Sequence, residues 1–206
     1  MIVIVDSGLG NVGSILNMLK KVGAHAVISS DDATLRQADK LILPGVGAFD
    51  NGMRQLAARG LVEPLCQSVA AGVPLLGICL GMQLLTLGSE EGNLPGLGWL
   101  EATTKRFSFQ AGGANPALRV PHMGWSEVVA EGEPALFDGL AEDARFYFVH
   151  SYYVACYDPC HVLARATYGH EFTAAVAKGN IFGVQFHPEK SHRFGMRLLA
   201  NFAAMA

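Results

Sequence analysis

Short apolar runs alternate with helical patterns along the first part of the chain, and this alternation constrains the fold most strongly. The four apolar runs are MIVIV, AVI, KLILPG and VPLLGIC, at residues 1–5, 26–28, 40–45 and 73–79. Between the first two runs, apolar residues recur at helical spacing, namely Val12, Ile15, Leu16, Leu19 and Val22. Strands that are separated by helices form parallel sheets covered on both faces. The sequence therefore predicts an α/β fold with a mostly parallel sheet and helices on both of its faces.

The pattern changes after Glu101. Four strand-like runs then follow one another with short polar turns between them: RFYFVHSYYVA, HVLARATYG, TAAVAKG and NIFGVQF. Such spacing is typical of hairpins, so we expect an antiparallel strand extension in the C-terminal half. A last helical pattern begins after Ser191, a residue that suits the N-cap position. Because no repeat, linker or low-complexity tract divides the chain, residues 1–206 are expected to form a single domain.

Charge and hydropathy indicate the surroundings in which the chain works. A net charge of -3 gives no electrostatic reason to expect nucleic acid or an anionic membrane as a partner. The uncharged stretch 70–88 approaches membrane-spanning length, but Pro74 and several glycines interrupt it, and its nearest charges, Glu63 and Glu90, are acidic. We interpret this stretch as a buried strand followed by a helix. No secretory signal pattern opens the chain, so the protein is expected in the cytoplasm.

Four cysteines are present, and in a cytoplasmic protein they are expected to be reduced thiols. They are Cys66, Cys79, Cys156 and Cys160. The last two, followed by His161, lack a second ligand pair at zinc-site spacing, so no metal is expected.

A glycine pattern near the N-terminus raises a different function. Gly8, Gly10 and Gly13 fit the Gly-x-Gly-x-x-Gly fingerprint of dinucleotide-binding proteins, and Asp31 and Asp32 follow at about the required distance of ~20 residues. The fingerprint is short and weak by itself. A nucleotide-dependent oxidoreductase is therefore the alternative against which the remaining motifs are weighed.

The segment VPLLGICLGMQLL has the pattern of a nucleophile elbow with cysteine in place of serine. Glycines stand two residues before and two residues after Cys79, where backbones must pass closely. The N–H of Leu80 is placed to donate to an oxyanion. A small buried cysteine with no chemical role is the alternative interpretation of this segment alone.

Two further segments supply what a cysteine nucleophile needs. In FGVQFHPEKS, Pro188 favours an extended conformation at His187, and extended residues two apart face the same side. Glu189 is therefore expected to orient the His187 ring while that ring exchanges protons with Cys79. The strand LILPG is followed by Val46 and Gly47, whose backbone can present a second oxyanion donor.

Together these segments resemble a known family. PGVGAF, GICLGMQ, PHMGW, YFVHSY and FGVQFHPEKS look like the class I, or triad, glutamine amidotransferases. Within that family they are most similar to the glutaminase subunits of imidazole glycerol phosphate synthase. The resemblance implies a flavodoxin-like fold, glutamine as substrate, no cofactor, and a triad of Cys79, His187 and Glu189. It also implies glutamine-binding roles for five residues, Gln83, Glu91, His150, Ser151 and Tyr152.

The same resemblance implies a partner. Ammonia would pass to a (β/α)8-barrel cyclase subunit of histidine biosynthesis, across a heterodimer interface formed by Asn11, Met123, Trp125, Tyr147 and Lys190. The glycine-rich loop that ends at Asn11 would then lie near this interface rather than bind a nucleotide.

Two positions depart from the family pattern, since Ser7 and Ser126 stand where relatives often have tyrosine and asparagine. A free-standing cysteine hydrolase of the γ-glutamyl hydrolase or peptidase type, a glutaminase subunit of another synthase, and a non-catalytic binding protein remain alternatives. Dependence on a partner separates the first of these from the subunit interpretation.

Overall fold

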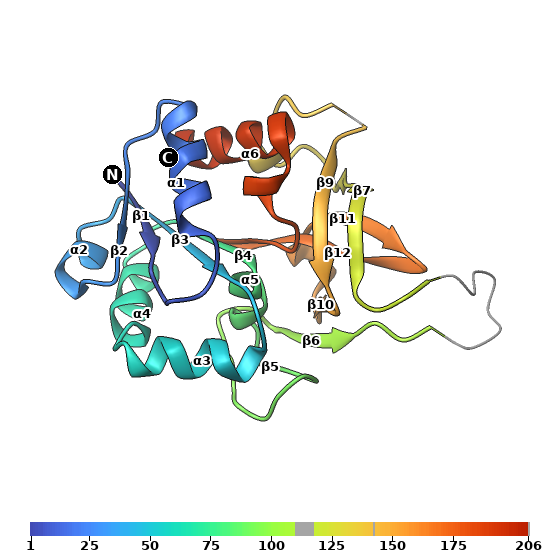
Figure 1. Cartoon of the computed structure of the whole chain (residues 1–206), viewed down its shortest axis with the longest axis horizontal. Coiled ribbons are helices and arrows are strands. Elements are labelled where there is room, and N and C mark those ends of the chain that lie inside the picture. The colour runs from blue at the N-terminus through green and yellow to red at the C-terminus, as the bar shows by residue number, and fades with distance from the viewer. Residues whose placement is uncertain (110–117, 142, 206) are drawn as a thin grey trace.

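The computed structural model of the chain describes residues 1–109, 118–141 and 143–205. Its main sheet begins with five parallel strands in the order β2-β1-β3-β4-β13 (Figure 1). Their bounds are β1 Ile2–Val5, β2 Ala26–Ser29, β3 Lys40–Gly45, β4 Leu75–Cys79 and β13 Ile181–Val184. This order and these directions confirm the predicted mostly parallel sheet.

Helices cover both faces of the parallel strands, because each strand buries alternate side chains on opposite sides. Ile2 and Ile4 of β1 pack in one core cluster, and Val3 and Val5 pack in the other. In Figure 1, α1 and α6 lie above the sheet and α3 and α4 lie below it. The helices are α1 Val12–Lys21, α2 Asp32–Arg36, α3 Phe49–Ala58, α4 Val62–Ala70, α5 Leu80–Leu84 and α6 His192–Ala204.

The antiparallel extension continues the same sheet beyond β13. There β12 pairs with β13, β10 and β11, while β6 joins β10 and β8 joins β11. A separate two-stranded sheet of β7 and β9 lies beside this extension (Figure 1). The bounds are β5 Gly88–Ser89, β6 Ala102–Arg106, β7 His122–Glu127, β8 Val129–Ala130, β9 Arg145–His150, β10 Tyr152–Cys156, β11 Val162–Tyr168 and β12 His170–Lys178. Three short 3-10 helices complete the fold, η1 Ala135–Phe137, η2 Pro159–His161 and η3 Pro188–Lys190.

The hairpin prediction is correct for part of this region and wrong for the rest. β11 with β12, and β12 with β13, form antiparallel pairs as expected. However, β13 also pairs in parallel with β4, so it belongs to the core sheet as well. The run RFYFVHSYYVA, expected as one strand, is divided at Ser151 into β9 and β10; β9 pairs with β7, and β10 pairs with β12 rather than with the following β11. The chain passes from the small sheet to the main sheet at Ser151.

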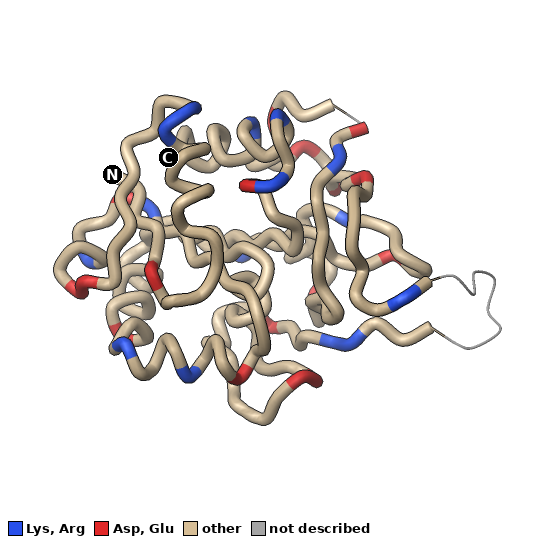
Figure 2. The backbone as a smooth tube through the Cα atoms, viewed as in Figure 1, with Lys and Arg blue, Asp and Glu red and all other residues tan. Residues whose placement is uncertain are grey.

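The uncharged stretch 70–88 is a buried strand and a short helix, as predicted. β4 is buried along its whole length and α5 follows it directly. Among the residues described, none of the helices combines the length and the apolar character needed to span a bilayer. Figure 2 shows that basic and acidic residues are interspersed along the described part of the chain, with neither sign confined to one region of the fold.

Candidate active site

A cavity of about 310 Å³ lies at the carboxyl ends of β3 and β4, next to the antiparallel extension. This end of a parallel sheet is where α/β proteins bind ligands. Every residue predicted to act in catalysis, in the oxyanion hole or in glutamine binding lines this active-site cavity, except Glu189, which lies behind His187. The lining residues are Val46, Gly47, Cys79, Leu80, Gln83, Glu91, Pro121, Val149, His150, Ser151, Tyr152 and His187.

Cys79 stands at the junction of β4 and α5 in a strained backbone conformation. Its φ of 55° is rare for a residue with a side chain. Such strain persists only where the surroundings enforce it. A Cβ at Gly77 would lie 2.8 Å from the backbone of Gly81, and a Cβ at Gly81 would overlap the carbonyl oxygen of Leu43. Glycine at both positions therefore allows the sharp turn, which confirms the predicted elbow geometry.

His187 and Glu189 form a buried pair. His187 Nδ1 lies 2.8 Å from Glu189 Oε1, and the two side chains are 2% and 3% exposed. The other ring nitrogen, Nε2, is buried and has no hydrogen-bond partner among the described residues. Burial lowers the pKa of His187, but interactions with Cys79 and Glu189 outweigh burial and raise this pKa to about 9. The site therefore favours an imidazolium next to the sulfur, which is the partner that a thiolate nucleophile requires.

The route by which Glu189 reaches His187 differs from the prediction. His187 is extended, but residues 188–190 form the 3-10 helix η3 rather than a continued strand. Pro188 stands at the first position of this turn, where its fixed φ is tolerated. The carboxylate thus meets the ring across a helical turn, and the contact predicted from an extended chain is obtained by a different backbone path.

Ser191 occupies the N-cap position of α6, but its side chain does not cap the helix, which corrects the prediction. Its hydroxyl donates to the His187 carbonyl at 2.6 Å and accepts from the Tyr147 N–H at 3.0 Å. Both bonds of the hydroxyl are therefore made to backbone groups outside α6. Ser191 therefore ties η3 to β9 and fixes the backbone of His187.

The predicted oxyanion loop lies at the rim of the cavity. Val46 is 42% exposed, and Gly47 has a φ of 101°, a conformation that favours glycine. Next to this loop, Glu91 accepts a hydrogen bond from the Phe49 N–H at 2.8 Å, at the first position of α3. Glu91 therefore both lines the cavity and holds the helix that follows the loop.

Gln83 and Gln185 connect the cavity floor to the nucleophile. Gln83 Nε2 donates to the Tyr152 carbonyl and to Gln185 Oε1, each at 3.1 Å. Gln185 Nε2 lies 3.8 Å from Cys79 Sγ, within hydrogen-bond range for sulfur. Sequence reasoning missed Gln185, although a polar residue inside the apolar run FGVQF is the signal that indicates it. Because both hydrogens of Gln83 Nε2 bond to protein acceptors, its Oε1 is the atom left for a ligand.

The segment from His150 to Tyr152 forms the opposite wall of the cavity. Its carbonyls already have partners, since Phe107 N–H donates to Ser151 at 3.0 Å and His150 Nδ1 lies 2.8 Å from the Tyr152 oxygen. The Tyr152 oxygen also accepts from Gln83 Nε2, so both of its lone pairs are used, whereas the Ser151 oxygen has a lone pair left for a ligand.

The predicted interface residues gather beside η3 on the outer face of β7 and β9. Met123 is 62% exposed and Trp125 is 46% exposed, and Trp125 lies opposite Tyr147 in the strand register. Lys190 Nζ lies 5.6 Å from the Tyr147 ring centre. A residue that the sequence did not indicate, His192, stacks on Trp125 with ring centres 5.5 Å apart.

Asn11 begins α1, which contacts η3, and its side chain accepts from the Ser14 N–H at 3.3 Å. We call this outer surface the Trp125 face; it is formed by Asn11, Met123, Trp125, Tyr147 and Lys190.

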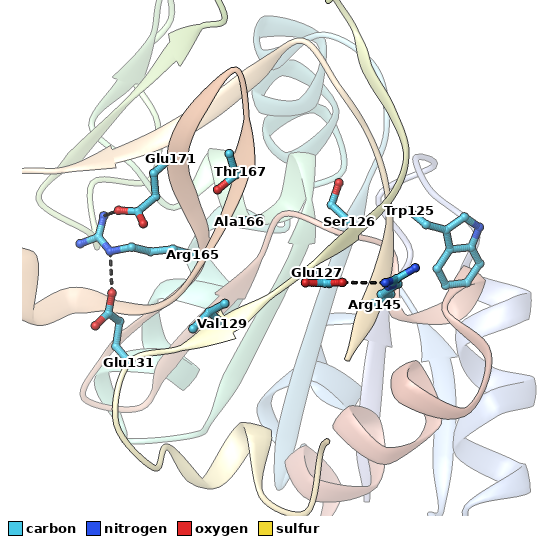
Figure 3. A pocket seen from close by; sticks show the side chains of 10 residues that line it. All are labelled: Trp125, Ser126, Glu127, Val129, Glu131, Arg145, Arg165, Ala166, Thr167 and Glu171. Carbon is cyan, nitrogen blue, oxygen red and sulfur yellow. Dashed lines mark hydrogen bonds and ion pairs between the residues drawn. The ribbon is translucent and has the colours of Figure 1, made fainter. Parts of the chain in front are cut away.

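A second cavity, of about 440 Å³, lies next to Trp125 on the molecular surface. Figure 3 shows the Glu127–Arg145 pair beside Trp125, and Arg165 held between Glu131 and Glu171. Arg145 and Arg165 are therefore each paired with a carboxylate that lines the same cavity.

The glycine-rich loop has structural uses. Gly8 and Gly10 adopt positive φ values of 76° and 96°, and Gly10 packs against Pro44 at the end of β3. Asp31 caps α2 through the Thr34 N–H, and Asp32 pairs with Arg36 on the surface. These contacts explain the fingerprint residues by turn and cap geometry.

Among the residues described, Asp158, Cys160 and His161 bring one possible metal-ligand atom each within 4.8 Å of one another. Asp158 accepts from the Cys160 N–H at the start of η2, so this turn accounts for their proximity. Burial raises the pKa of the neighbouring Cys156 thiol to about 11, which disfavours the thiolate that a metal would bind.

Comparisons with known proteins agree with this geometry. The family model described as "Glutamine amidotransferase class-I" matches residues 3–206. "Imidazole glycerol phosphate synthase subunit HisH 2" of Methanococcus maripaludis is 52% identical, and the protein of the same name from Pseudomonas aeruginosa is 51% identical. Each of these matches covers 100% of both chains.

Two solved structures share the fold. One is described as glutamine amidotransferase, with a TM-score of 0.71 and 23% identity over 98% of this chain and 99% of that one. The other is PurLQS from Thermotoga maritima, with a TM-score of 0.71 and 18% identity over 98% of this chain and 96% of that one. Because the family model spans nearly the whole chain and the relatives match it end to end, this protein belongs to the class I glutamine amidotransferase family.

Proposed function

We propose that this chain is the cytoplasmic glutaminase subunit of an imidazole glycerol phosphate synthase and acts in histidine biosynthesis. The full-length relatives at 52% and 51% identity, which carry the name of that synthase's HisH subunit, support this proposal. In the proposed reaction, glutamine and water give glutamate and ammonia.

One observation carries the catalytic part of the proposal. Cys79, in a strained elbow, and His187, which pairs with the buried Glu189, line the same cavity although they lie far apart in the sequence. A nucleophile, a base and a group that orients the base are the three parts that acyl transfer through cysteine requires.

The first half of the reaction makes a thioester. Cys79 Sγ attacks the carboxamide carbon of glutamine, and the oxyanion that forms accepts hydrogen bonds from backbone N–H groups of Leu80 and of the loop at Val46 and Gly47. His187 then protonates the departing nitrogen, so the carbon–nitrogen bond breaks and ammonia leaves.

The second half releases glutamate. His187, now neutral, accepts a proton from water, which attacks the thioester carbon and displaces Cys79 as thiolate. Glu189 stabilises the imidazolium in both halves. Gln83, Glu91 and the His150–Tyr152 wall would hold the amino-acid end of the substrate, with Gln83 Oε1 as an acceptor for its N–H groups.

The second part of the proposal concerns where the ammonia goes. We assign the Trp125 face to a (β/α)8-barrel cyclase subunit that consumes the ammonia in a heterodimer. The exposed Trp125 and Met123, with Tyr147 and Lys190 beside them, combine aromatic, apolar and cationic side chains that commonly anchor interfaces.

The Cys79→Ser variant tests the catalytic part. We expect loss of glutamine-dependent synthesis by the complex, while synthesis from free ammonium salts continues, because an alcohol beside His187 is a much weaker nucleophile. Cys66→Ser, which replaces a half-buried cysteine of α4 outside the cavity, is the control and should keep both activities. Retained glutamine-dependent synthesis in Cys79→Ser would contradict the proposed nucleophile.

Partner dependence separates the subunit from a free-standing hydrolase. The loop at Gly47 is exposed, and glycine permits dihedral angles that would let its peptide reorient, so we propose that the complex sets its oxyanion donor. A missing oxyanion donor costs about 10² to 10³ in turnover. Glutamate release should rise by about that factor from the isolated chain to the complex with its ribotide ligand, and equal rates would favour the hydrolase.

A further inference from the structure

Two buried histidines outside the triad lie end to end between the active-site cavity and the edge of β7. His122 is 2% exposed and His150 is 6% exposed. His122 Nδ1 lies 3.1 Å from His150 Nε2, and His150 Nδ1 lies 2.8 Å from the Tyr152 carbonyl oxygen. At the other end, His122 Nε2 lies 2.9 Å from the hydroxyl of Ser126. The mechanism above assigns no proton transfer to either ring.

The Tyr152 carbonyl determines where the hydrogens lie in this series of hydrogen bonds, which runs from Ser126 through His122 and His150 to Tyr152. A carbonyl oxygen can only accept, so His150 Nδ1 must carry a hydrogen. Burial lowers the pKa of His150 to about 3 and that of His122 to about 4, so each ring is neutral and carries one hydrogen. His150 Nε2 is then an acceptor, His122 Nδ1 must donate to it, and His122 Nε2 must accept from the Ser126 hydroxyl.

The inner end of this series of hydrogen bonds lies at the cavity wall formed by residues 150–152. The Tyr152 oxygen that accepts from His150 also accepts from Gln83 Nε2 at 3.1 Å. Gln83 in turn donates to Gln185, which lies 3.8 Å from Cys79 Sγ. The orientation of Gln83 Oε1, the atom left for glutamine, therefore depends on a carbonyl that His150 holds in place.

The outer end lies beside the Trp125 face. Ser126 is half-buried, follows Trp125 in β7 and lines the surface cavity drawn in Figure 3. The His122 ring is held by stacking on Tyr168 and Phe148, with ring centres 4.1 and 4.9 Å apart. Packing thus fixes the ring plane, and the hydroxyl of Ser126 donates to the His122 Nε2 that the Tyr152 carbonyl leaves as an acceptor.

We propose that Ser126 and His122 are positioning residues for the glutaminase reaction, acting through His150 to hold the Tyr152 carbonyl and Gln83 in the geometry that binds glutamine. This inference rests on the proposed function. It specifies that both histidines are Nδ1–H tautomers, the less common form of a neutral imidazole. It also specifies that loss of the Ser126 hydroxyl weakens glutamine binding more than it slows turnover.

The test compares Ser126→Ala with Ser126→Thr, which keeps a hydroxyl. Histidine ¹⁵N NMR of the full chain should show Nδ1–H tautomers for His122 and His150, and Ser126→Ala should shift the resonance of His122 Nε2 because this acceptor loses its donor. In the complex with the cyclase, the KM for glutamine of Ser126→Ala should rise about fivefold to tenfold with kcat nearly unchanged, because a buried acceptor loses its donor. Ser126→Thr should restore both the His122 Nε2 resonance and the KM.

His122→Phe gives a stronger change at the same place. The phenyl ring keeps the stacking on Tyr168 and Phe148 but removes both nitrogens, so His150 Nε2 loses its donor while the packing is retained. We expect a KM increase of about tenfold or more with a melting temperature close to that of the wild type. Glu127→Gln is the matched control, because this exposed neighbour of Ser126 pairs with Arg145 rather than with His122 or His150.

Two results would overturn the inference. One is a wild-type spectrum with Nε2–H tautomers at either histidine, which contradicts the proton order. The other is an unchanged KM for glutamine in both Ser126→Ala and His122→Phe, when both variants are folded and the wild-type complex is active. A wild-type complex that hydrolyses no glutamine overturns the proposed function itself, and this outcome is distinguishable from the first two.

Discussion

The two walls of the active-site cavity are built by different physical means. The wall from the parallel strands holds Cys79 by close contact of backbones. A Cβ at Gly77 would meet the backbone of Gly81, and a Cβ at Gly81 would meet the Leu43 carbonyl. The wall from the antiparallel extension and η3 holds its groups by hydrogen bonds, such as those of Ser191 to the backbone of His187 and of His122 to His150.

The difference separates stability from activity. A steric contact between backbones in regular elements cannot relax, so an added methyl group there is expected to cost folding free energy. A hydrogen bond at the edge of a cavity can be lost with the fold retained, and the cost then falls on geometry and rate. Substitutions in the first wall should therefore destabilise the protein, and those in the second should change kinetics.

The largest effect tests the second wall. His187→Ala should lower glutamine-dependent turnover by about 10³-fold or more while the protein stays folded, because the base and acid of both half-reactions is removed. Steady-state kinetics of the complex, with melting curves of the same samples, measure both quantities. Glu189→Gln, which keeps the shape of the side chain, should lose roughly 10- to 100-fold, since it orients the ring and does not react. An unfolded His187→Ala would contradict the division between the walls.

The next effect tests the first wall. Gly81→Ala should lower the free energy of unfolding by about 3 kcal/mol, because the new methyl group meets the carbonyl oxygen of a core strand. Denaturant titration measures the loss. Gly13→Ala is the control, since Gly13 lies in α1 with nothing near its Cβ position, and alanine there should stabilise by about 0.5–1 kcal/mol. If both variants lose the same free energy, steric contact at Gly81 is not what holds the elbow.

The pH dependence of stability tests how the two walls interact. The pKa of His187 is about 9 in the folded protein and about 6.5 in the unfolded chain, so its protonation stabilises the fold. This contribution is fully present below about pH 6.5 and is lost as the pH rises through 9, by up to about 3 kcal/mol. Denaturant midpoints measured from pH 6 to 10 should fall less steeply in Glu189→Gln, which removes part of the raised pKa. Identical slopes in the two proteins would show that Glu189 does not raise the pKa of His187.

The smallest effect tests the outside of the second wall. If the Trp125 face binds the proposed cyclase, Trp125→Ala should weaken that binding by about 2 kcal/mol with the chain still folded, because a partner would bury the exposed ring. Titration calorimetry and a melting curve measure the two quantities. If the variant instead unfolds and its folded fraction binds with unchanged affinity, Trp125 has a structural role through its stacking on His192.

Local patterns predicted much of this molecule. The apolar runs of the first part became β1 to β4, and the GICLG segment became a strand–turn–helix with Cys79 at a positive φ. The segment after β13 placed His187 in the same cavity as Cys79 and Glu189 against the His187 ring. These features depend on residues close in sequence, where periodicity, proline and glycine restrict the backbone directly.

Predictions failed where one residue had two possible partners. Ser191 suited an N-cap but bonds instead to the backbone of His187 and Tyr147, and the single run RFYFVHSYYVA became two strands, β9 and β10, that pair in different sheets. In each case the local pattern predicted the right type of interaction, a hydrogen bond or a strand, and the packing of distant segments selected the partner.

The sequence by itself determined the α/β class, the elbow at Cys79 and the pairing of His187 with Glu189, because each depends on spacing along a few residues. Only the tertiary structure decided that Gln185 faces Cys79 and that His122 meets His150, across separations of 106 and 28 residues. A hydrogen bond between distant segments depends on how strands are ordered in a sheet. Strand order follows from the packing of the whole core, which no short stretch of sequence specifies.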